Sequence, residues 1–178
     1  MSDAARSIID RSRPVAGSRG LGVTRRGQSM LYAVLLMPTL FLVLALAIDI
    51  AALQLDKLRL RYALDLAMVT AATAVDRNTY SQTGRLRLDP NVATTIARDY
   101  LLQNLSGLPD TPNPERIVAA ADIAVVNQVP ARDPYSGMLL DRPAICARIR
   151  VTHRFDLLGW VGMHAVNLAI TSTAEIRT

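Results

Sequence analysis

The stretch that decides the fold lies at residues 24–53 and reads TRRGQSMLYAVLLMPTLFLVLALAIDIAAL. No charged residue occurs between residues 29 and 48. A bilayer core about 30 Å thick is crossed by roughly twenty helical residues, so this run has the length of a transmembrane helix. Pro38 lies inside the run, where a proline removes a backbone donor and predicts a kink. Asp49 ends the run and marks the expected membrane boundary.

This apolar run has two interpretations, a retained anchor or a cleaved export signal. A signal peptide has an apolar region of about 7–15 residues that ends in small residues, and Ala45-Leu46-Ala47 provides such an ending. The run is longer than that, and the helical pattern continues past Asp49 without a break. We therefore expect a retained transmembrane helix over residues 29–48. The alternative is a secreted or envelope binding module, or an enzyme, released by signal cleavage near Ala47.

The positive charge of the chain is concentrated at its start. The formal net charge is +5, and residues 1–27 contain six arginines against two aspartates. Basic residues flank the cytoplasmic side of membrane helices, so residues 1–28 are predicted to be a cytoplasmic tail and the chain after residue 49 to lie outside the cytoplasm. The remainder is nearly neutral and has no basic cluster interleaved with aromatic residues, which argues against nucleic-acid binding.

Beyond the membrane, residues 49–76 contain neither glycine nor proline, and apolar residues recur at spacings of three and four. This pattern predicts an amphipathic helix that continues the membrane span. A seam of small side chains follows one side of it, formed by Ala63, Ala67, Ala71 and Ala74. The seam either covers the protein's own domain or forms a docking surface for neighbouring subunits. Asp65 interrupts the pattern and is expected either to be solvated or to pair with Arg61, one turn back.

Residues 77–178 are expected to form a small extracytoplasmic domain that starts with a polar loop at residues 79–89. Asp89-Pro90 reads as a cap followed by proline at the first helical position, which predicts a helix that ends at Ser106-Gly107. Its apolar side is predicted to consist of Val92, Ile96, Tyr100 and Leu101. The prolines of residues 108–115 should then interrupt regular structure.

The period of the apolar residues changes to two after residue 116, which indicates strands. We expect a strand that alternates over residues 117–125 and ends near Pro130, strands over residues 145–155 and 166–176, and a long turn region at residues 131–143. The predicted fold class is therefore α+β. A long N-terminal transmembrane and amphipathic helix, pilin-like in arrangement, packs on a small antiparallel sheet of three or four strands with one extra short helix.

No motif for catalysis, cofactor binding or metal binding is found in the sequence, so we expect neither an enzyme nor a small-molecule substrate. His153 falls on the apolar side of its strand, where a hydrogen-bonded buried imidazole is expected, and neither it nor His164 has a partner at metal-ligand spacing. Cys146 lies beside arginines, which could lower its pKa, but without a nearby histidine it is a weak candidate for a nucleophile. A single-pass envelope sensor is a further functional class for which no pocket signature is found.

Two segments carry a resemblance to a known family. Residues 25–72 begin with Arg26-Gly27, place Pro38 within the apolar run and leave it through Ala47-Ile48-Asp49. Residues 147–178 contain ARIRVTHRFDLLGWVG and VNLAITSTAEIRT. In these features the chain resembles the TadE/TadG-like proteins of the bacterial tight-adherence (Flp-type) pilus system.

The resemblance implies an inner-membrane component of pilus assembly that contacts membrane lipid and other pilus or secretion-machine subunits through its N-terminal helix. Pilin-like members of the group are cut after a glycine and carry glutamate five residues later. If Gly27 were that glycine, cleavage would leave Gln28 first, but Tyr32 stands where the glutamate is expected. We therefore favour the uncut anchor over the processed subunit, and we keep both as expectations.

Overall fold

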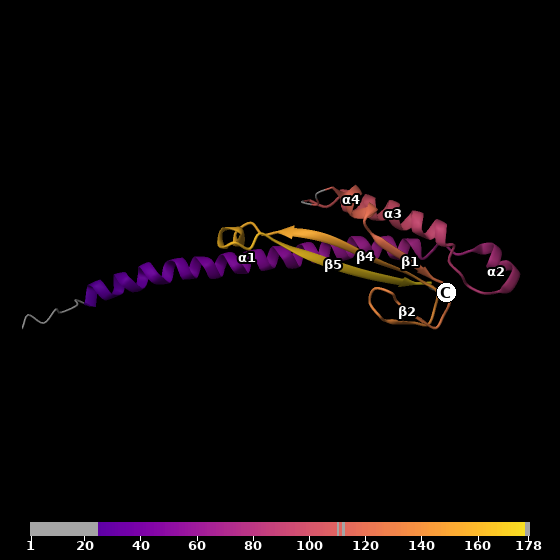
Figure 1. Cartoon of the computed structure of the whole chain (residues 1–178), viewed down its shortest axis with the longest axis horizontal. Coiled ribbons are helices and arrows are strands. Elements are labelled where there is room, and N and C mark those ends of the chain that lie inside the picture. Colours follow the sequence, from indigo (N-terminus) through magenta and orange to yellow (C-terminus); the bar gives the residue numbers. More distant parts are fainter. Residues whose placement is uncertain (1–24, 110, 112, 177–178) are drawn as a thin grey trace, which may run out of the picture. The chain divides into compact units, whose positions relative to one another are not determined.

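The computed structural model describes residues 25–109, 111 and 113–176. The chain divides into two units, residues 1–41 and 42–178. The described part of the first unit belongs to helix α1 (Arg25–Ala71), and the second unit holds the rest of α1 and every later element (Figure 1). Those later elements are α2 (Arg77–Thr83), α3 (Pro90–Ser106), α4 (Pro114–Ala119), β1 (Asp122–Val126), β2 (Ala131–Arg132), β3 (Leu139–Leu140), β4 (Ala144–Arg154), the 3-10 helix η1 (Leu158–Val161) and β5 (Ala165–Glu175).

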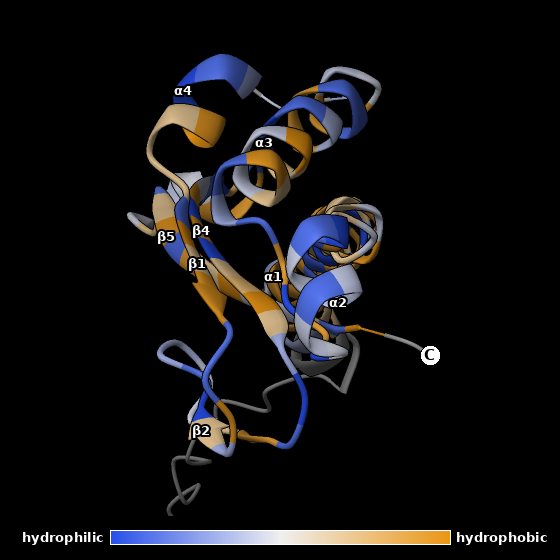
Figure 2. Ribbon diagram, turned by 90° about the vertical axis from the view of Figure 1, so that its right-hand side faces the viewer, coloured by the Kyte–Doolittle hydropathy of each residue, from blue (hydrophilic) through white to orange (hydrophobic). Residues whose placement is uncertain are grey.

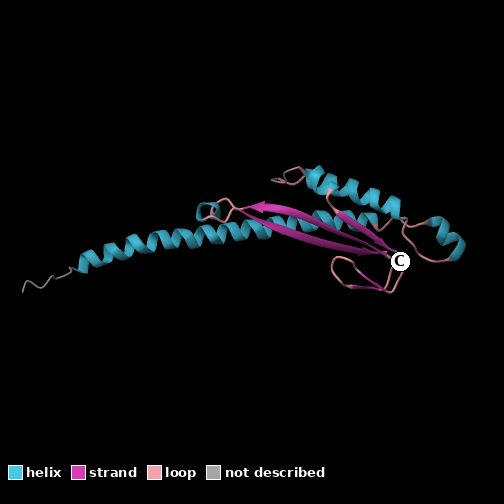
Figure 3. Cartoon of the chain, in the orientation of Figure 1, coloured by secondary structure: helices cyan, strands magenta, loops and turns pink. Residues whose placement is uncertain are grey.

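The predicted fold class is confirmed. The protein is α+β, with a long apolar N-terminal helix packed on a small antiparallel sheet of three strands (Figure 3). The strand order is β1-β4-β5, and β2 and β3 form a separate two-stranded ribbon. Four further helical segments accompany the sheet in the described residues, rather than the one extra helix expected.

Helix α1 ends at Ala71, earlier than the predicted residue 76. The N–H groups of Thr73 and Ala74 donate to carbonyls three residues back, which tightens the last turn. Val75 then forms an isolated antiparallel bridge with Leu88. The side chain of Asp76 accepts a hydrogen bond from the Thr79 N–H at 3.0 Å and begins a new helix. Residues 72–76 contain no glycine or proline, but α1 still ends at Ala71, because Asp76 caps the start of the next helix.

The stretch predicted as a polar loop at residues 79–89 is partly helical, since α2 occupies Arg77–Thr83. Asp76 caps its start, and Gly84 ends it in the left-handed conformation with φ of 65°. A glycine adopts this conformation without the steric cost that a Cβ atom imposes. The Asp–Gly pair that brackets α2 therefore defines both of its ends.

Helix α3 has the predicted bounds, and Asp89 accepts hydrogen bonds from the N–H groups of Asn91 and Val92. The predicted apolar face is half correct, because Leu101 is fully buried and Ile96 is partly buried against the core. Val92 and Tyr100 are exposed, whereas the buried residues are Ala93, Ala97, Leu101 and Leu105. The two alanines allow α3 to approach the domain closely, and the bulkier neighbours remain at the surface.

The strand predicted over residues 117–125 is mostly wrong in its first half. Residues up to Ala119 belong to α4, which begins with Pro114 in its first turn, and β1 starts only at Asp122. An alternation of apolar and other residues over so short a stretch fits one turn of helix as well as a strand. The strands expected over residues 145–155 and 166–176 are confirmed as β4 and β5, each shifted by one residue.

Strand β4 separates two different environments, as its alternating residues predicted. In the antiparallel register Ile145 lies opposite Ala174 and Ile149 opposite Ile170. These odd-numbered β4 side chains face α1 and α3, which cover the same face of the sheet (Figure 2). The largest fully buried members of this core are Leu64, Met68, Leu88, Leu101, Leu105, Ile145 and Ile149.

The opposite face of the sheet is covered at one end by the β2–β3 ribbon. There Leu140, Ala144 and Cys146 form a small second cluster. Asp133 is buried beside it and accepts hydrogen bonds from Ser136 and Thr173 hydroxyls and from the N–H of Tyr135. This carboxylate ties the ribbon to β5.

Candidate functional site

The apolar segment, residues 30–48 of α1, exposes side chains that a water-soluble domain would bury. Met30, Leu35, Phe41, Val43 and Ile48 are each at least 50 % exposed. Within the described residues α1 is the one helix that is long and apolar enough to cross a membrane, and none of its most apolar window is buried. A core helix of a soluble protein passes the same length test but is covered by its neighbours. The segment has the properties of a helix that could span a membrane.

Three residues singled out from the sequence lie in the amino-terminal part of this helix. Gly27 and Gln28, the candidate processing site, are in the first turn of α1. Pro38 lies within the helix and cannot donate a hydrogen bond to the carbonyl four residues back. The next residue, Thr39, adds a bond from its hydroxyl to the Leu35 carbonyl at 2.9 Å. The helix therefore continues through Pro38.

Asp49 is the boundary residue predicted from the sequence, and the structure assigns it a tertiary role that was not foreseen. The residue is only 4 % exposed. Asp49 Oδ2 accepts the backbone N–H of Leu158 at 2.6 Å and that of Leu157 at 3.1 Å. Both residues belong to the β4–β5 connection, so Asp49 joins α1 to the end of the sheet. We call this contact the junction.

The β4–β5 connection exposes apolar side chains beside the junction. We define the tip as residues 157–163. It includes η1, after which Gly162 adopts a φ of 91° and turns the chain back towards β5. Trp160 is 93 % exposed, and Leu157 and Met163 are exposed as well. Figure 1 shows this connection alongside α1, at the opposite end of the sheet from α2.

The alanine seam lies inside the protein's own core. Ala63, Ala67, Ala71 and Ala74 are all buried, and they pack with the sheet and α3. Asn104 of α3 donates from its side-chain amide to the Ala63 carbonyl at 3.1 Å, which fixes the close approach. The structure thus matches the first of the two interpretations, a seam that covers the protein's own domain. In this conformation these alanines are not available to a neighbouring subunit.

A second apolar line follows the other side of α1. We call it the outer stripe, and its members are Leu44, Ile48, Ala51, Leu55, Leu58, Tyr62, Leu66 and Val69. Their spacing of three and four residues keeps them on one side of the helix. All are exposed, in contrast to the buried Leu64 and Met68. Asp65 lies off this stripe and pairs with Arg61 at 3.7 Å, as expected.

The side chain of His153 forms contacts within its own domain. Its Nδ1 lies 2.9 Å from Asp56 Oδ2 on α1, and its ring meets Phe155 edge-on with the ring centres 5.5 Å apart. The expectation of a hydrogen-bonded, largely buried imidazole is confirmed. The pair lines an open groove of about 450 Å³ between α1 and the sheet. Within the described residues, no three His, Cys, Asp or Glu side chains are grouped so as to hold a metal ion.

The arginine neighbours of Cys146 do not lower its pKa, so the thiol is not an activated nucleophile. The thiol is fully buried in the second cluster. Burial raises its pKa to about 12, and the nearby Asp133 carboxylate adds to this shift. The arginines of β4 flank it in sequence, but Arg148 instead binds Asp122 at 2.9 Å.

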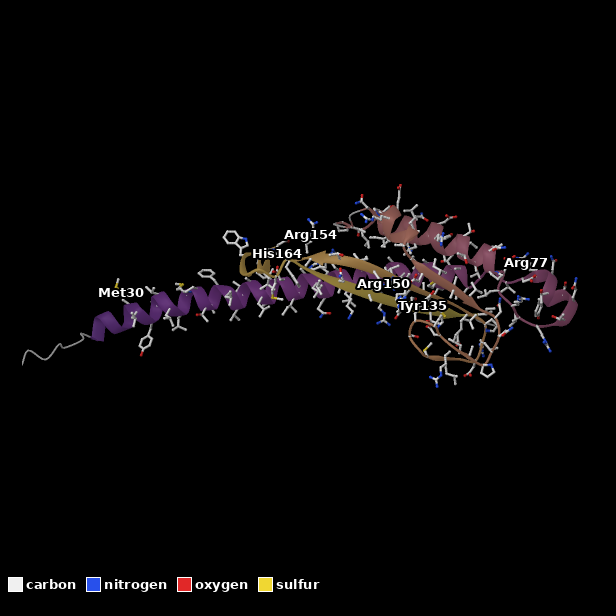
Figure 4. All side chains as sticks on the ribbon, in the orientation of Figure 1. Met30, Arg77, Tyr135, Arg150, Arg154 and His164 are labelled. Atoms are coloured by element: carbon white, nitrogen blue, oxygen red, sulfur yellow. The ribbon has the colours of Figure 1, made fainter. Side chains whose placement is uncertain are left out.

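The remaining part of the outer sheet face is polar and carries arginines. Arg148 and Arg150 both approach the Asp122 carboxylate, and a hydrogen bond from Arg148 holds the pKa of Asp122 below its usual value. Arg148 also lies over the Tyr135 ring, 5.1 Å from its centre. Arg150 and Arg154 project from the same strand (Figure 4). These contacts are those of a solvated, internally paired sheet face.

The described structure defines an architecture in which an exposed apolar helix continues into the core of a small α+β domain. No protein-family model matches the chain, and no curated protein or solved structure matches it. Functional proposals for this chain therefore depend on its own residues, on the geometry above and on the resemblance found in the sequence.

Proposed function

We propose that the chain is a non-enzymatic, membrane-anchored component of bacterial tight-adherence pilus biogenesis, either a minor pilin-like subunit or an accessory assembly subunit. One observation carries the membrane anchor. The apolar segment is exposed along its length, yet it belongs to the same helix that supplies Leu64 and Met68 to the domain core. The assignment to the pilus system is supported by the resemblance of residues 24–76 and 147–178 to TadE/TadG-like proteins.

In this proposal the chain crosses the bacterial inner membrane once, or is associated with the pilus, and the domain after residue 49 is extracytoplasmic. The arginines of residues 1–28 keep the amino terminus in the cytoplasm, because basic flanks are retained on that side. The junction supports the placement of the boundary at Asp49. There the first charged residue after the apolar run bonds to the domain instead of to lipid.

The partners in this proposal are other pilus or secretion-machine subunits, and the contact surface on the helix is the outer stripe. The alanine seam is buried against the domain, so it does not supply this surface. The stripe offers exposed side chains that are large and apolar, including Leu58 at 64 % and Tyr62 at 71 %. A three–four spacing of such residues is the pattern that packs one helix against another.

The non-enzymatic role is supported by the state of the groups that could carry chemistry. Cys146 is buried with a raised pKa, which disfavours the reactive thiolate. His153 is held by Asp56, and no serine, threonine or cysteine hydroxyl or thiol bonds to it among the described contacts.

The test is the mass of the amino terminus of protein purified from its native host, together with its partition between membrane and soluble fractions. A start at Met1 or Ser2 in membranes supports the uncut anchor, and a start at Gln28 supports the processed, pilin-like form. A start near Ile48 in the soluble fraction contradicts the anchor and supports the secreted module. Deletion of the gene should also reduce the number of surface pili, and an unchanged number contradicts the pilus assignment.

A further inference from the structure

We propose that the tip, residues 157–163, is a second membrane contact that enters the interfacial layer of the same bilayer that α1 crosses. The inference rests on the membrane anchor proposed above and goes beyond it, because it assigns a lipid-binding surface to the folded domain. The occupant is the headgroup and upper acyl-chain region of the lipid. Three observations carry it: the position of the tip, its composition and its rigidity.

The position follows from the junction. Strand β4 runs antiparallel to α1, since His153 contacts Asp56 and the following Leu157 and Leu158 contact Asp49. The β4–β5 connection therefore lies at the level of α1 where the apolar segment ends. A bilayer has about 5–8 Å of polar interface outside each edge of its hydrocarbon core. If the hydrocarbon core ends near Ile48, this polar interface lies at the level of the tip.

The composition of the tip suits this layer. Trp160 is the one tryptophan of the chain, and its side chain is almost entirely exposed at 93 %. Leu157 and Met163 add exposed apolar surface, while Asp156 and His164 flank the tip with polar groups. Tryptophan is enriched at membrane interfaces because its ring is apolar and its N–H needs a polar partner. Such a side chain has no packing role within the domain itself.

The tip is also held rigidly. The junction fixes its first two backbone N–H groups, and the Leu158 side chain is buried beneath it. The Met163 N–H donates to the Leu158 carbonyl at 3.2 Å, and the Phe155 N–H donates to the His164 carbonyl at 3.1 Å. Trp160 therefore lies in a loop that is closed by hydrogen bonds at both of its ends. Together with α1, this loop would restrict the tilt of the domain on the membrane.

The single tryptophan allows a direct test on the unmodified full-length chain. The protein is reconstituted into phosphatidylethanolamine and phosphatidylglycerol vesicles. Trp160 emission is then recorded with shallow or deep brominated lipids, or with acrylamide in the water. We expect blue-shifted emission, strong quenching by shallow bromines, weaker quenching by deep bromines and little quenching by acrylamide.

A control variant moves the probe to the far end of the domain by combining Trp160→Phe with Met138→Trp. Met138 is exposed on the β2–β3 ribbon connection, so its tryptophan should respond to acrylamide and not to brominated lipid. Retained secondary structure by circular dichroism shows that the variant is folded.

Each other outcome for wild-type Trp160 overturns the proposal. Strong acrylamide quenching without bromine quenching means that the tip remains in water. Protection from both quenchers means that protein, such as a second copy, covers it. Both results leave the anchor intact when the chain still floats with the vesicles. Failure to associate with vesicles at all overturns the anchor and the tip contact together.

Discussion

At the scale of single residues, Asp49 connects sequence, fold and proposed function. Its carboxylate ends the apolar run and accepts two backbone N–H groups from the tip. A buried N–H that loses its acceptor costs about 1–3 kcal/mol, because its bond to water is not recovered. The charge at this position was evident from the sequence. Its partners were not, since Leu157 and Leu158 lie more than a hundred residues away.

The first prediction compares two substitutions of Asp49. Asp49→Ala should lower the free energy of unfolding by about 1–3 kcal/mol, since both N–H groups of the tip lose their acceptor. Asp49→Asn should cost clearly less, because its carbonyl oxygen can still accept both. Denaturant unfolding of the detergent-solubilised chain, followed by circular dichroism, measures the difference. Equal losses in the two variants would show that the charge, and not the pair of bonds, holds the junction.

The second prediction concerns Cys146, whose pKa is raised to about 12 by burial. Near pH 8 roughly one thiol in ten thousand would be ionised, against roughly one in four for an ordinary cysteine of pKa about 8.5. A soluble aromatic disulfide reagent should therefore leave the folded chain unmodified and react quickly after denaturation. The exposed Met138→Cys variant serves as the control and should gain one fast thiol. Fast labelling of wild-type Cys146 would contradict the burial.

At the scale of elements, α1 beyond residue 50 has two apolar sides with different roles. One side holds the alanine seam and is buried against the sheet and α3, and the other is the exposed outer stripe. The recurrence of apolar residues predicted the helix correctly. It did not separate the two sides, because an apolar residue has the same hydropathy in a core and on an uncovered surface.

The third prediction uses two alanines of the same helix. Ala67→Leu places extra methyl groups between α1 and the sheet and should destabilise the domain by about 1–3 kcal/mol. Ala51→Leu adds the same groups to the exposed outer stripe and should change stability by less than about 0.5 kcal/mol. Denaturant unfolding of both variants gives the comparison. A tolerated leucine at residue 67 would contradict close packing at the seam.

The fourth prediction tests the outer stripe as the contact surface. Leu58→Glu and Tyr62→Glu place a charge on the stripe without touching the core, so the domain should fold while the number of surface pili falls. Gln54→Glu introduces the same charge at an exposed position off the stripe and should leave pili unchanged. Pilus counts by electron microscopy, with circular dichroism of each variant, are the measurements. Normal piliation in both stripe variants would exclude this surface.

Other elements show where local pattern is sufficient and where it is not. The strand at residues 145–155 was predicted with its two faces because its alternation extends over eleven residues, and β4 has that length. Residues 117–121 alternate too briefly to distinguish a strand from the end of the short helix α4 and the turn that follows it. Apolar periodicity does not indicate helix α2, because its seven residues are largely polar and its caps define it.

At the scale of the whole molecule, the proposed function requires that the two ends of the chain lie on opposite sides of one membrane. This arrangement can be measured by cysteine labelling. The buried thiol of Cys146 is expected to be unreactive, so a cysteine introduced elsewhere is the one reactive site in the folded chain. Suitable positions are Ser12 in the basic tail and Gln82, which is exposed on α2. Ser12 is a small residue, and Gln82 is a polar residue outside the core.

The last prediction follows from these two positions. In intact spheroplasts, a membrane-impermeant maleimide should label Gln82→Cys but not Ser12→Cys, and permeabilisation should expose the latter. The arginines of the tail predict this orientation, because basic residues are retained in the cytoplasm while a nearly neutral domain is translocated. Labelling of Ser12→Cys alone would mean inverted insertion. Recovery of both cysteines on a water-soluble chain would mean that no helix holds the domain in the membrane, and that the exposed apolar segment is covered by another protein.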